Sequence, residues 1–227
     1  ICGHATIAAH YVRAKERNME GGTVVQKTKA GILPVEVVRT LSDYSITMTQ
    51  GTPAVSAPFG DAVRERIADA LGIAHEELCR EYPVAVASTG HSKVMVPLYS
   101  NELLHGLRPD LQKLTKISKQ IECNGYYVFT LNPQNKILVH GRMFAPAIGI
   151  AEDPVTGNAN GPLGAYLVHF NILQEEDAPC FDFDILQGEA IKRDGTMHVH
   201  VEKEHGAPKL VQITGNAVIA FSTEITI

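Results

Sequence analysis

Two short segments rich in small apolar residues dominate the hydrophobic pattern of the chain. Residues 6–14 consist mainly of Ala, Ile, Tyr and Val, and charged residues follow them. They are predicted to form a helix that ends at a pair of glycines. Residues 159–170 have a similar composition and are predicted to form a second helix. A glycine turn stands directly before each of these segments.

Most of the remaining apolar positions alternate with polar ones, which is typical of strands. Turn residues bound these runs, and a linker rich in Gly, Pro and Ser is predicted over residues 51–58. Strands are predicted over residues 23–28, 32–39, 44–50, 83–88, 93–98, 125–130 and 137–144, and a β-rich meander over residues 181–221. Two amphipathic helices are predicted over residues 61–71, with Asp61 as the cap, and 110–120.

Each half of the chain therefore contains a glycine turn, a helix and several strands. Such a repeat indicates duplication and two similar lobes of an α+β protein. Helices and strands do not alternate regularly, which argues against a doubly wound parallel sheet. Residues 1–56 are predicted to form the first lobe, completed by a C-terminal strand over residues 216–227. Residues 57–215 are predicted to form the second lobe.

Composition and charge narrow the possible functions. The net charge of −5 comes without a basic stripe, so we expect no nucleic-acid partner. No apolar run approaches a membrane span and no secretory signal opens the chain, so we expect no membrane partner and a cytoplasmic location. The four cysteines lie far apart and are predicted to be free thiols, with no zinc or disulfide framework.

The two glycine turns are the main candidates for chemistry. They read Cys2-Gly3-His4-Ala5-Thr6 and Thr156-Gly157-Asn158-Ala159-Asn160. The first N–H groups of a helix have no partner within the helix and carry partial positive charge, so they can bind a carboxylate or a developing oxyanion. Glycine lets the backbone approach a ligand closely. We expect the two turns to form the walls of one site for a small anionic metabolite.

Acid–base residues adjoin both turns. His4 follows Gly3 and can shuttle a proton near neutral pH. Asp153 precedes the second turn and can act as a cap or a base. A third candidate, His91, lies in a Gly turn between two predicted strands and could reach the same site. His198 and His200 share one strand face, but no third metal ligand stands out, so we expect a solvated face and no metal site.

These motifs resemble the phenazine-biosynthesis isomerase-like (PhzF-like) family, and more narrowly its uncharacterised enterobacterial members. The resemblance runs almost from end to end of the chain. It is carried by ICGHAT at residues 1–6, STGHSK at 88–93, GRMFAP at 141–146, EDPVTGNA at 152–159 and LQG at 186–188.

The resemblance implies a fold similar to diaminopimelate epimerase, with two pseudo-symmetric lobes, each a barrel-like sheet around a central helix. It also implies a homodimer and proton transfer without metal or organic cofactor, with catalytic residues at His4 and Asp153. Gly3, Thr156, Gly157, Asn158 and His91 are expected to bind substrate. Asn158 replaces the family's usual Ser and cannot relay a proton as a hydroxyl can.

The start of the chain departs from the family pattern. The family's principal acid–base Glu lies on a segment before the Gly-His motif, and the chain begins at Ile1, directly before that motif. We therefore expect the catalytic Glu to lie on a segment upstream of Ile1.

Two other functions remain open on the sequence. A two-base amino-acid epimerase needs a thiol on each wall, but Thr156 stands opposite Cys2, and its hydroxyl has too high a pKa to replace a thiolate. A non-catalytic protein that binds a small metabolite is the second alternative.

Overall fold

One long sheet runs through the chain in a computed structural model that describes residues 2–28, 31–173 and 178–224. Within these residues the sheet has 12 strands, in the order β1-β2-β3-β12-β11-β10-β8-β7-β6-β5-β4, with β9 paired to β8. Neighbouring strands are antiparallel except in the pairs β8·β10 and β6·β7. The mixed sheet and its helices confirm the α+β class, and they exclude the regular alternation of a doubly wound sheet.

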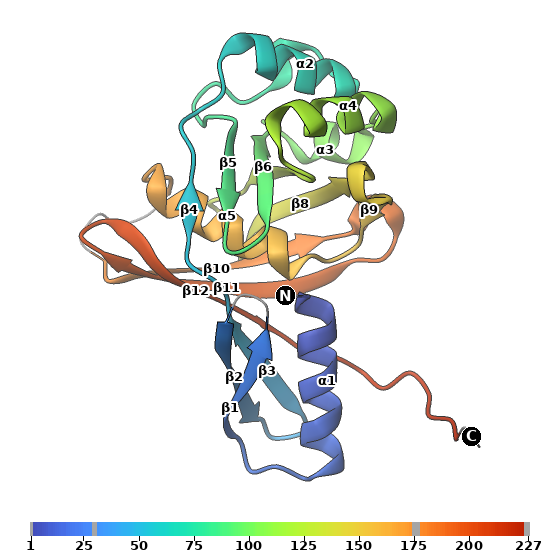
Figure 1. The fold of residues 1–227 in the computed structure, drawn as a ribbon, viewed down its shortest axis with the longest axis vertical. Helices are drawn as coiled ribbons and strands as arrows, with labels where there is room; N and C mark the ends of the chain where they lie inside the picture. The colour runs from blue at the N-terminus through green and yellow to red at the C-terminus, as the bar shows by residue number, and fades with distance from the viewer. Residues whose placement is uncertain (1, 29–30, 174–177, 225–227) are drawn as a thin grey trace.

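In the first lobe a long helix lies along one face of a small group of strands (Figure 1). Its elements are α1 (Gly3–Glu16), β1 (Gly22–Thr28), β2 (Gly31–Arg39) and β3 (Tyr44–Thr49). The buried side of α1 carries Ile7, Tyr11 and Ala14, which recur at helical spacing. They pack against Val35, Val37, Tyr44 and Ile46 in a small separate core.

The second lobe surrounds the other small-residue helix, α5 (Gly157–His169), with strands. These strands are β4 (Ala54–Val55), β5 (Ala85–Ser88), β6 (Ser92–Pro97), β7 (Tyr126–Leu131), β8 (Ile137–Ala145), β9 (Ile150–Asp153), β10 (Cys180–Gln187), β11 (Gly195–Glu204) and β12 (Ala207–Gly215).

Small residues let α5 lie this deep in the lobe. Residues 159–168 of the helix are all buried. A Cβ at Gly164 would come within 2.8 Å of the side chains of both Val199 and Val201 on β11. Close packing of helix on sheet therefore requires glycine at this position.

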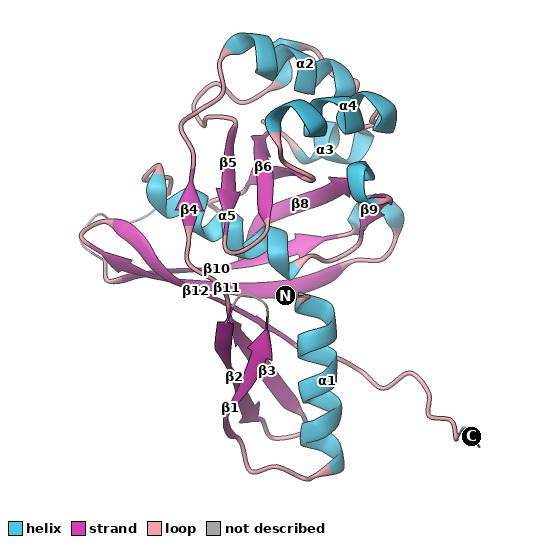
Figure 2. Cartoon of the chain, in the orientation of Figure 1, coloured by secondary structure: helices cyan, strands magenta, loops and turns pink. Residues whose placement is uncertain are grey.

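The remaining helices cover the end of the second lobe that points away from the first lobe (Figure 2). They are α2 (Asp61–Leu71), α3 (Asn101–Gly106) and α4 (Leu111–Ile121), with short 3-10 turns η1 (His75–Glu77), η2 (Pro146–Ile148) and η3 (Glu189–Ile191). In the part of the chain that the structure describes, no helix is long and apolar enough to cross a membrane.

The two lobes are joined by strand pairing between β3 and β12. Gln212 lies opposite Thr49 and Gly215 opposite Ile46 in this antiparallel pair. The last strand of the second lobe thus continues the sheet of the first (Figure 1).

Several predictions about single elements need correction. Gly60, not Asp61, is the N-cap of α2, and Asp61 is the first residue of the helix. The short elements α3, β4 and β9 were not expected. Residues 216–224, in which a C-terminal strand was predicted, form no strand, and residues 225–227 lie outside the described residues. β4 pairs with β5 of the second lobe, although its residues fall within the predicted first lobe, and the division at residue 56 stays a prediction.

Candidate functional site

The N-termini of α1 and α5 meet at the junction of the two lobes. A Cβ placed on Gly3 would lie 3.3 Å from the Cα of Gly157 and 3.6 Å from its backbone nitrogen. Both glycines are buried. The two glycine turns, which are far apart in sequence, therefore lie backbone against backbone, and larger residues would push the helices apart.

The residues before these glycines occupy matching positions. Cys2 is the N-cap of α1 with φ −121° and ψ 113°, and Thr156 is the N-cap of α5 with φ −124° and ψ 96°. Neither side chain caps its helix. Two positive helix ends thus converge, and neither is capped by its own N-cap side chain, an arrangement that favours a bound anion.

The hydroxyl of Thr156 is turned toward Asp153 instead. It donates a hydrogen bond to Oδ2 of Asp153 over 2.5 Å. Gln187, at the end of β10, holds this pair from the other side. Its Nε2 donates to the backbone carbonyl of Asp153 (2.8 Å) and to Oγ1 of Thr156 (3.0 Å). Its Oε1 accepts from the backbone N–H of Thr156 and from Nδ2 of Asn160, both over 3.1 Å. This buried amide fixes the half-buried Asp153 next to the start of α5.

A second buried glutamine joins the first lobe to α5. Nε2 of Gln50 donates to the carbonyl oxygen of Gly157 over 3.0 Å. The hydroxyl of Thr89, in the turn between β5 and β6, donates to Oε1 of Gln50. The backbone N–H of Gly51 also donates to the carbonyl of Thr89 over 3.0 Å. The β5–β6 turn is therefore fastened beside the glycine junction.

This turn leads into a buried lysine. Lys93, on β6, is only 8% exposed, and its stem packs where a Cβ of Gly125 would otherwise lie. Its Nζ donates to the carbonyl of Ser92 over 3.0 Å. Burial lowers the pKa of Lys93, while the negative charge of Asp153 acts in the opposite direction. The site thus contains a partly desolvated cation within electrostatic reach of Asp153.

The carboxylate next to Asp153 has a different role. Glu152 forms a bidentate ion pair with the buried Arg142, at 2.9 Å from Nε and 2.8 Å from Nη2. Nη1 of Arg142 also donates to the carbonyls of Leu104 and Leu107. Glu152 is therefore a structural anchor that ties β9 to β8 and to α3.

The other expected site residues lie on α1, on α5 and in the β5–β6 turn. His4 is exposed in the first turn of α1, and Asn158 is half-buried in the first turn of α5. His91 is exposed in the β5–β6 turn, and partial desolvation of its ring lowers its pKa. The structure brings Gly3 and Gly157 together and fastens Asp153 to Thr156. The catalytic and binding roles of all these residues stay predictions.

Sequence reasoning missed Gln50, Gln187 and Lys93 as parts of this region. A signal was present for two of them. Gln187 follows Phe183 and Ile185 on the inward face of β10, and Lys93 shares the alternation of β6 with Met95. A polar residue at an inward position of an alternating strand indicates a buried hydrogen-bonding or charged role.

The fold and the paired helix ends define the class of protein as an α+β protein of the diaminopimelate-epimerase-like type. The chain belongs to the phenazine biosynthesis-like protein family, whose family model matches residues 1–223. This confirms the family resemblance of the sequence motifs.

Similar proteins of known sequence are named isomerases. The chain is 50% identical over 228 residues to an uncharacterized isomerase of Clostridium acetobutylicum, covering 100% of this chain and 75% of the relative. It is 46% identical to the uncharacterized isomerase YddE of Escherichia coli K12, covering 99% and 75%. A trans-2,3-dihydro-3-hydroxyanthranilate isomerase of Pseudomonas fluorescens is 30% identical, with 85% and 63% covered.

Solved structures confirm the fold. A PhzF-family phenazine biosynthesis protein of Bacillus anthracis matches with a TM-score of 0.86 and 30% identity, covering 100% of this chain and 76% of the other. A hydroxyproline epimerase of Agrobacterium vitis matches with a TM-score of 0.62 and 12% identity, covering 95% and 63%. At that identity the likeness concerns the fold alone.

Proposed function

We propose that this protein is an isomerase that moves a proton on a small carboxylate-bearing metabolite, without an organic or metal cofactor. The observation that carries the proposal is the contact between Gly3 and Gly157 at two helix N-termini without side-chain caps. The metabolite would bind there, between the two lobes. The isomerase names of the relatives support the reaction class.

The helix ends would stabilise charge on the substrate. Removal of a proton beside a carboxylate or carbonyl group produces an enolate, whose developing negative charge needs donors fixed in advance. Backbone N–H groups of the two first turns are such donors. The ammonium group of Lys93 would add a positive charge at the same site, and its partial burial strengthens its effect on the substrate.

Asp153 and His4 would serve the proton transfer. Asp153 is held by Thr156 and Gln187, so it would present a fixed oxygen to a polar group of the substrate or to the principal acid–base residue. His4, exposed in the first turn of α1, would bind substrate or shuttle a proton. Asn158 and His91 would contact the substrate and determine which metabolite binds.

The two alternatives predict different outcomes. A two-base epimerase would need a second acid–base group at Thr156, whose hydroxyl donates to Asp153 instead. A non-catalytic protein would bind an anion at the helix ends without exchanging its protons. Measurement of both binding and exchange separates these functions from the proposed isomerase.

Exchange in heavy water tests the proposal. The full natural protein, with any residues that precede Ile1, would be incubated with trans-2,3-dihydro-3-hydroxyanthranilate, related unsaturated carboxylates and 2-amino acids. Deuterium incorporation would be followed by NMR. We expect incorporation with rearrangement of an unsaturated carboxylate, and a decrease of about 10²–10⁴-fold in the Asp153→Asn variant.

Asp184→Asn provides the matched control, because Asp184 is also a half-buried, hydrogen-bonded carboxylate but lies on β10 beside His198. This variant should keep full activity. Binding without exchange would favour the non-catalytic alternative, and inversion of a 2-amino acid would favour the epimerase. Failure to bind or convert any carboxylate would contradict the proposal.

We further infer that the protein acts as a cytoplasmic homodimer, as the resemblance to the family implies. Light scattering of the purified full protein tests the oligomeric state, and a mass of one chain would contradict the inference.

A further inference from the structure

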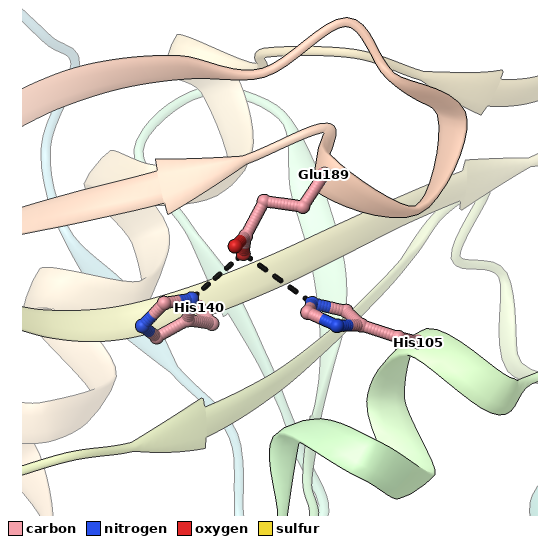
Figure 3. Close-up of side chains that lie close together, drawn as sticks. All are labelled: His105, His140 and Glu189. Atoms are coloured by element: carbon pink, nitrogen blue, oxygen red, sulfur yellow. Dashed lines mark hydrogen bonds and ion pairs between the residues drawn. The ribbon is translucent and has the colours of Figure 1, made fainter.

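Three potential metal ligands converge on one point in the second lobe (Figure 3). His105 lies in α3, His140 on β8 and Glu189 at the start of η3. Oε2 of Glu189 is 2.7 Å from Nδ1 of His140 and 3.3 Å from Nε2 of His105. One nitrogen or oxygen of each residue lies within 4.8 Å of those of the other two.

We propose that His105, His140 and Glu189 form a binding site for a zinc-type divalent transition-metal ion. This cluster is called the His–His–Glu site below. The proposal does not rest on the isomerase function, because its test measures metal binding directly.

The donor set selects the class of metal. Two imidazole nitrogens and one carboxylate oxygen are typical ligands of Zn²⁺ and Co²⁺, whereas Mg²⁺ and Ca²⁺ prefer oxygen ligands alone. Zinc–ligand distances of about 2.0–2.2 Å place tetrahedral ligand atoms roughly 3.3 Å apart. The separation between Oε2 of Glu189 and Nε2 of His105 equals this value, whereas Nδ1 of His140 would have to move away from Oε2 by about 0.6 Å, which a small side-chain rotation allows. Water would take the fourth position.

The partial burial of the His–His–Glu site favours binding of a metal ion, because its side chains are held more firmly than those of an ion pair on the surface. The side chains of His140 and Glu189 are 13% and 26% exposed, and that of His105 is 37% exposed. Two ligands are thus held in the lobe while the third faces solvent, which leaves a path for the ion. The three residues come from separate elements. Two of these elements, α3 and β8, are held together by Arg142 of β8, whose Nη1 donates to the backbone carbonyls of Leu104, His105 and Leu107.

The site also connects to the region of Asp153. Glu189 follows Gly188, whose added Cβ would lie 2.7 Å from the carbonyl oxygen of Pro154. Gln187, one residue earlier, holds Asp153 and Thr156. A bound ion would therefore restrain the segment that supports the candidate active site.

A second cluster is a weaker candidate. Cys180, Asp182 and His200 lie on the outer face of β10 and β11. The side chains of Asp182 and His200 are 43% and 29% exposed, more than those of Glu189 and His140, so this cluster is less well held in the lobe. A hydrogen bond with Asp182 raises the pKa of the Cys180 thiol, which disfavours the thiolate that a metal needs. This cluster supplies the control for the experiment.

Titration of the metal-free protein with Zn²⁺, followed by calorimetry, tests the proposal, and the visible absorption of Co²⁺ reports the coordination geometry. We expect a saturable equivalent of Zn²⁺ at the His–His–Glu site, a Co²⁺ spectrum with nitrogen ligands, and no such binding of Mg²⁺. Loss of a second-shell partner alone weakens metal binding by about 10- to 100-fold, so His140→Ala and Glu189→Gln should weaken it at least that much.

His105→Ala provides a second variant at the most exposed ligand, in case His140→Ala does not fold. His200→Ala is the matched control and should leave this equivalent in place. Absence of saturable Zn²⁺ binding would overturn the proposal. So would Zn²⁺ binding that His200→Ala abolishes and the His105, His140 and Glu189 variants retain.

Discussion

Lys93 carries an ionisable group at an inward position of β6. The side chain is nearly buried, and burial lowers its pKa because the charged form loses hydration. At neutral pH the protonated form of Lys93 is therefore less stable in the folded protein than in the unfolded chain, and this difference destabilises the fold. An anionic substrate at the helix ends would offset this cost, which is a reason to keep a charge at an inward strand position.

Replacement of this charge gives a prediction at the residue scale. Lys93→Met should raise the thermal midpoint at pH 7 by about 2–4 °C, the shift that roughly 1 kcal/mol produces in a protein of this size, while it lowers substrate binding. A lowered folded pKa means that the penalty is full at neutral pH and disappears as the pH rises toward the unfolded value of about 10.4. The stability advantage of the variant should shrink accordingly.

Calorimetry at pH 7 and in the alkaline range measures this difference. Lys116→Met, at an exposed position of α4, is the control and should change the midpoint little at either pH. A variant at Lys93 that is less stable at pH 7 would contradict the argument.

The side-chain amide of Gln187 forms hydrogen bonds with three residues. Its side chain satisfies Asp153, Thr156 and Asn160 inside the lobe. Gln187→Leu would leave buried donors and acceptors without partners and should lower the free energy of unfolding by about 2–4 kcal/mol. Denaturant unfolding measures the effect. Gln212→Leu removes the half-buried Gln212, whose Nε2 donates a hydrogen bond to Oγ1 of Thr49, and should cost about 1 kcal/mol or less. Equal costs would show that the Gln187 network contributes no more than one bond.

At the scale of elements, the junction of α1 and α5 is the main feature. Both helices begin at a glycine, and their N-termini meet because neither glycine has a side chain. Like ends of two helix dipoles repel each other, so packing of the lobes must hold the helices in place. The bound anion would relieve this repulsion, which links the binding function to the relative position of the two helices.

Gly3→Ala tests this arrangement. The added Cβ would lie 3.3 Å from the backbone of Gly157, so the helix ends must separate by a few tenths of an ångström. We expect substrate or anion affinity to fall by about tenfold, equivalent to about 1.4 kcal/mol, with the fold retained. Calorimetric titration measures the affinity. Gly106→Ala, at an exposed position where a Cβ meets nothing within 4 Å, is the control. Unchanged affinity in Gly3→Ala would argue against binding at the junction.

At the scale of the whole molecule, one sheet connects several cores. The first lobe buries only a few side chains, from Ile7 on α1 to Ile46 on β3, whereas the second lobe contains two larger clusters. The lobes are linked by the β3–β12 pair, by the contact of the helix ends and by the hydrogen bonds of Gln50. Met48 of β3 also packs in one of the clusters of the second lobe. Such an arrangement allows the lobes to open with different free energies.

Hydrogen exchange should reveal this difference. β1 lies at the edge of the sheet and has no buried residue, whereas β7 is central and almost fully buried. We expect the amides of β1 that bond to β2 to exchange at least about 100-fold faster than those of β7. Exchange followed by mass spectrometry on the native protein measures both rates. Equal rates would indicate that both lobes open only in a single global transition.

Elements with a strong local pattern could be predicted from the amino-acid sequence alone. Helices at α1, α2, α4 and α5 and most strands were predictable, because apolar residues recur at the helical or strand period over many positions. The glycine turns and the family motifs also indicated the fold and the reaction class. Shorter elements were not predictable: β9 exists because it pairs with β8, and its four residues carry too little local pattern to indicate a strand.

Contacts between residues that are distant in sequence became visible only in the folded protein. No local pattern could show that Gly3 touches Gly157, that Gln187 reaches Asp153, or that Lys93 is buried within the influence of that carboxylate. The same holds for His105, His140 and Glu189, which come from a helix, a strand and a turn. Local periodicity is set by the backbone of each segment, whereas these contacts depend on strand register and lobe packing over the whole chain.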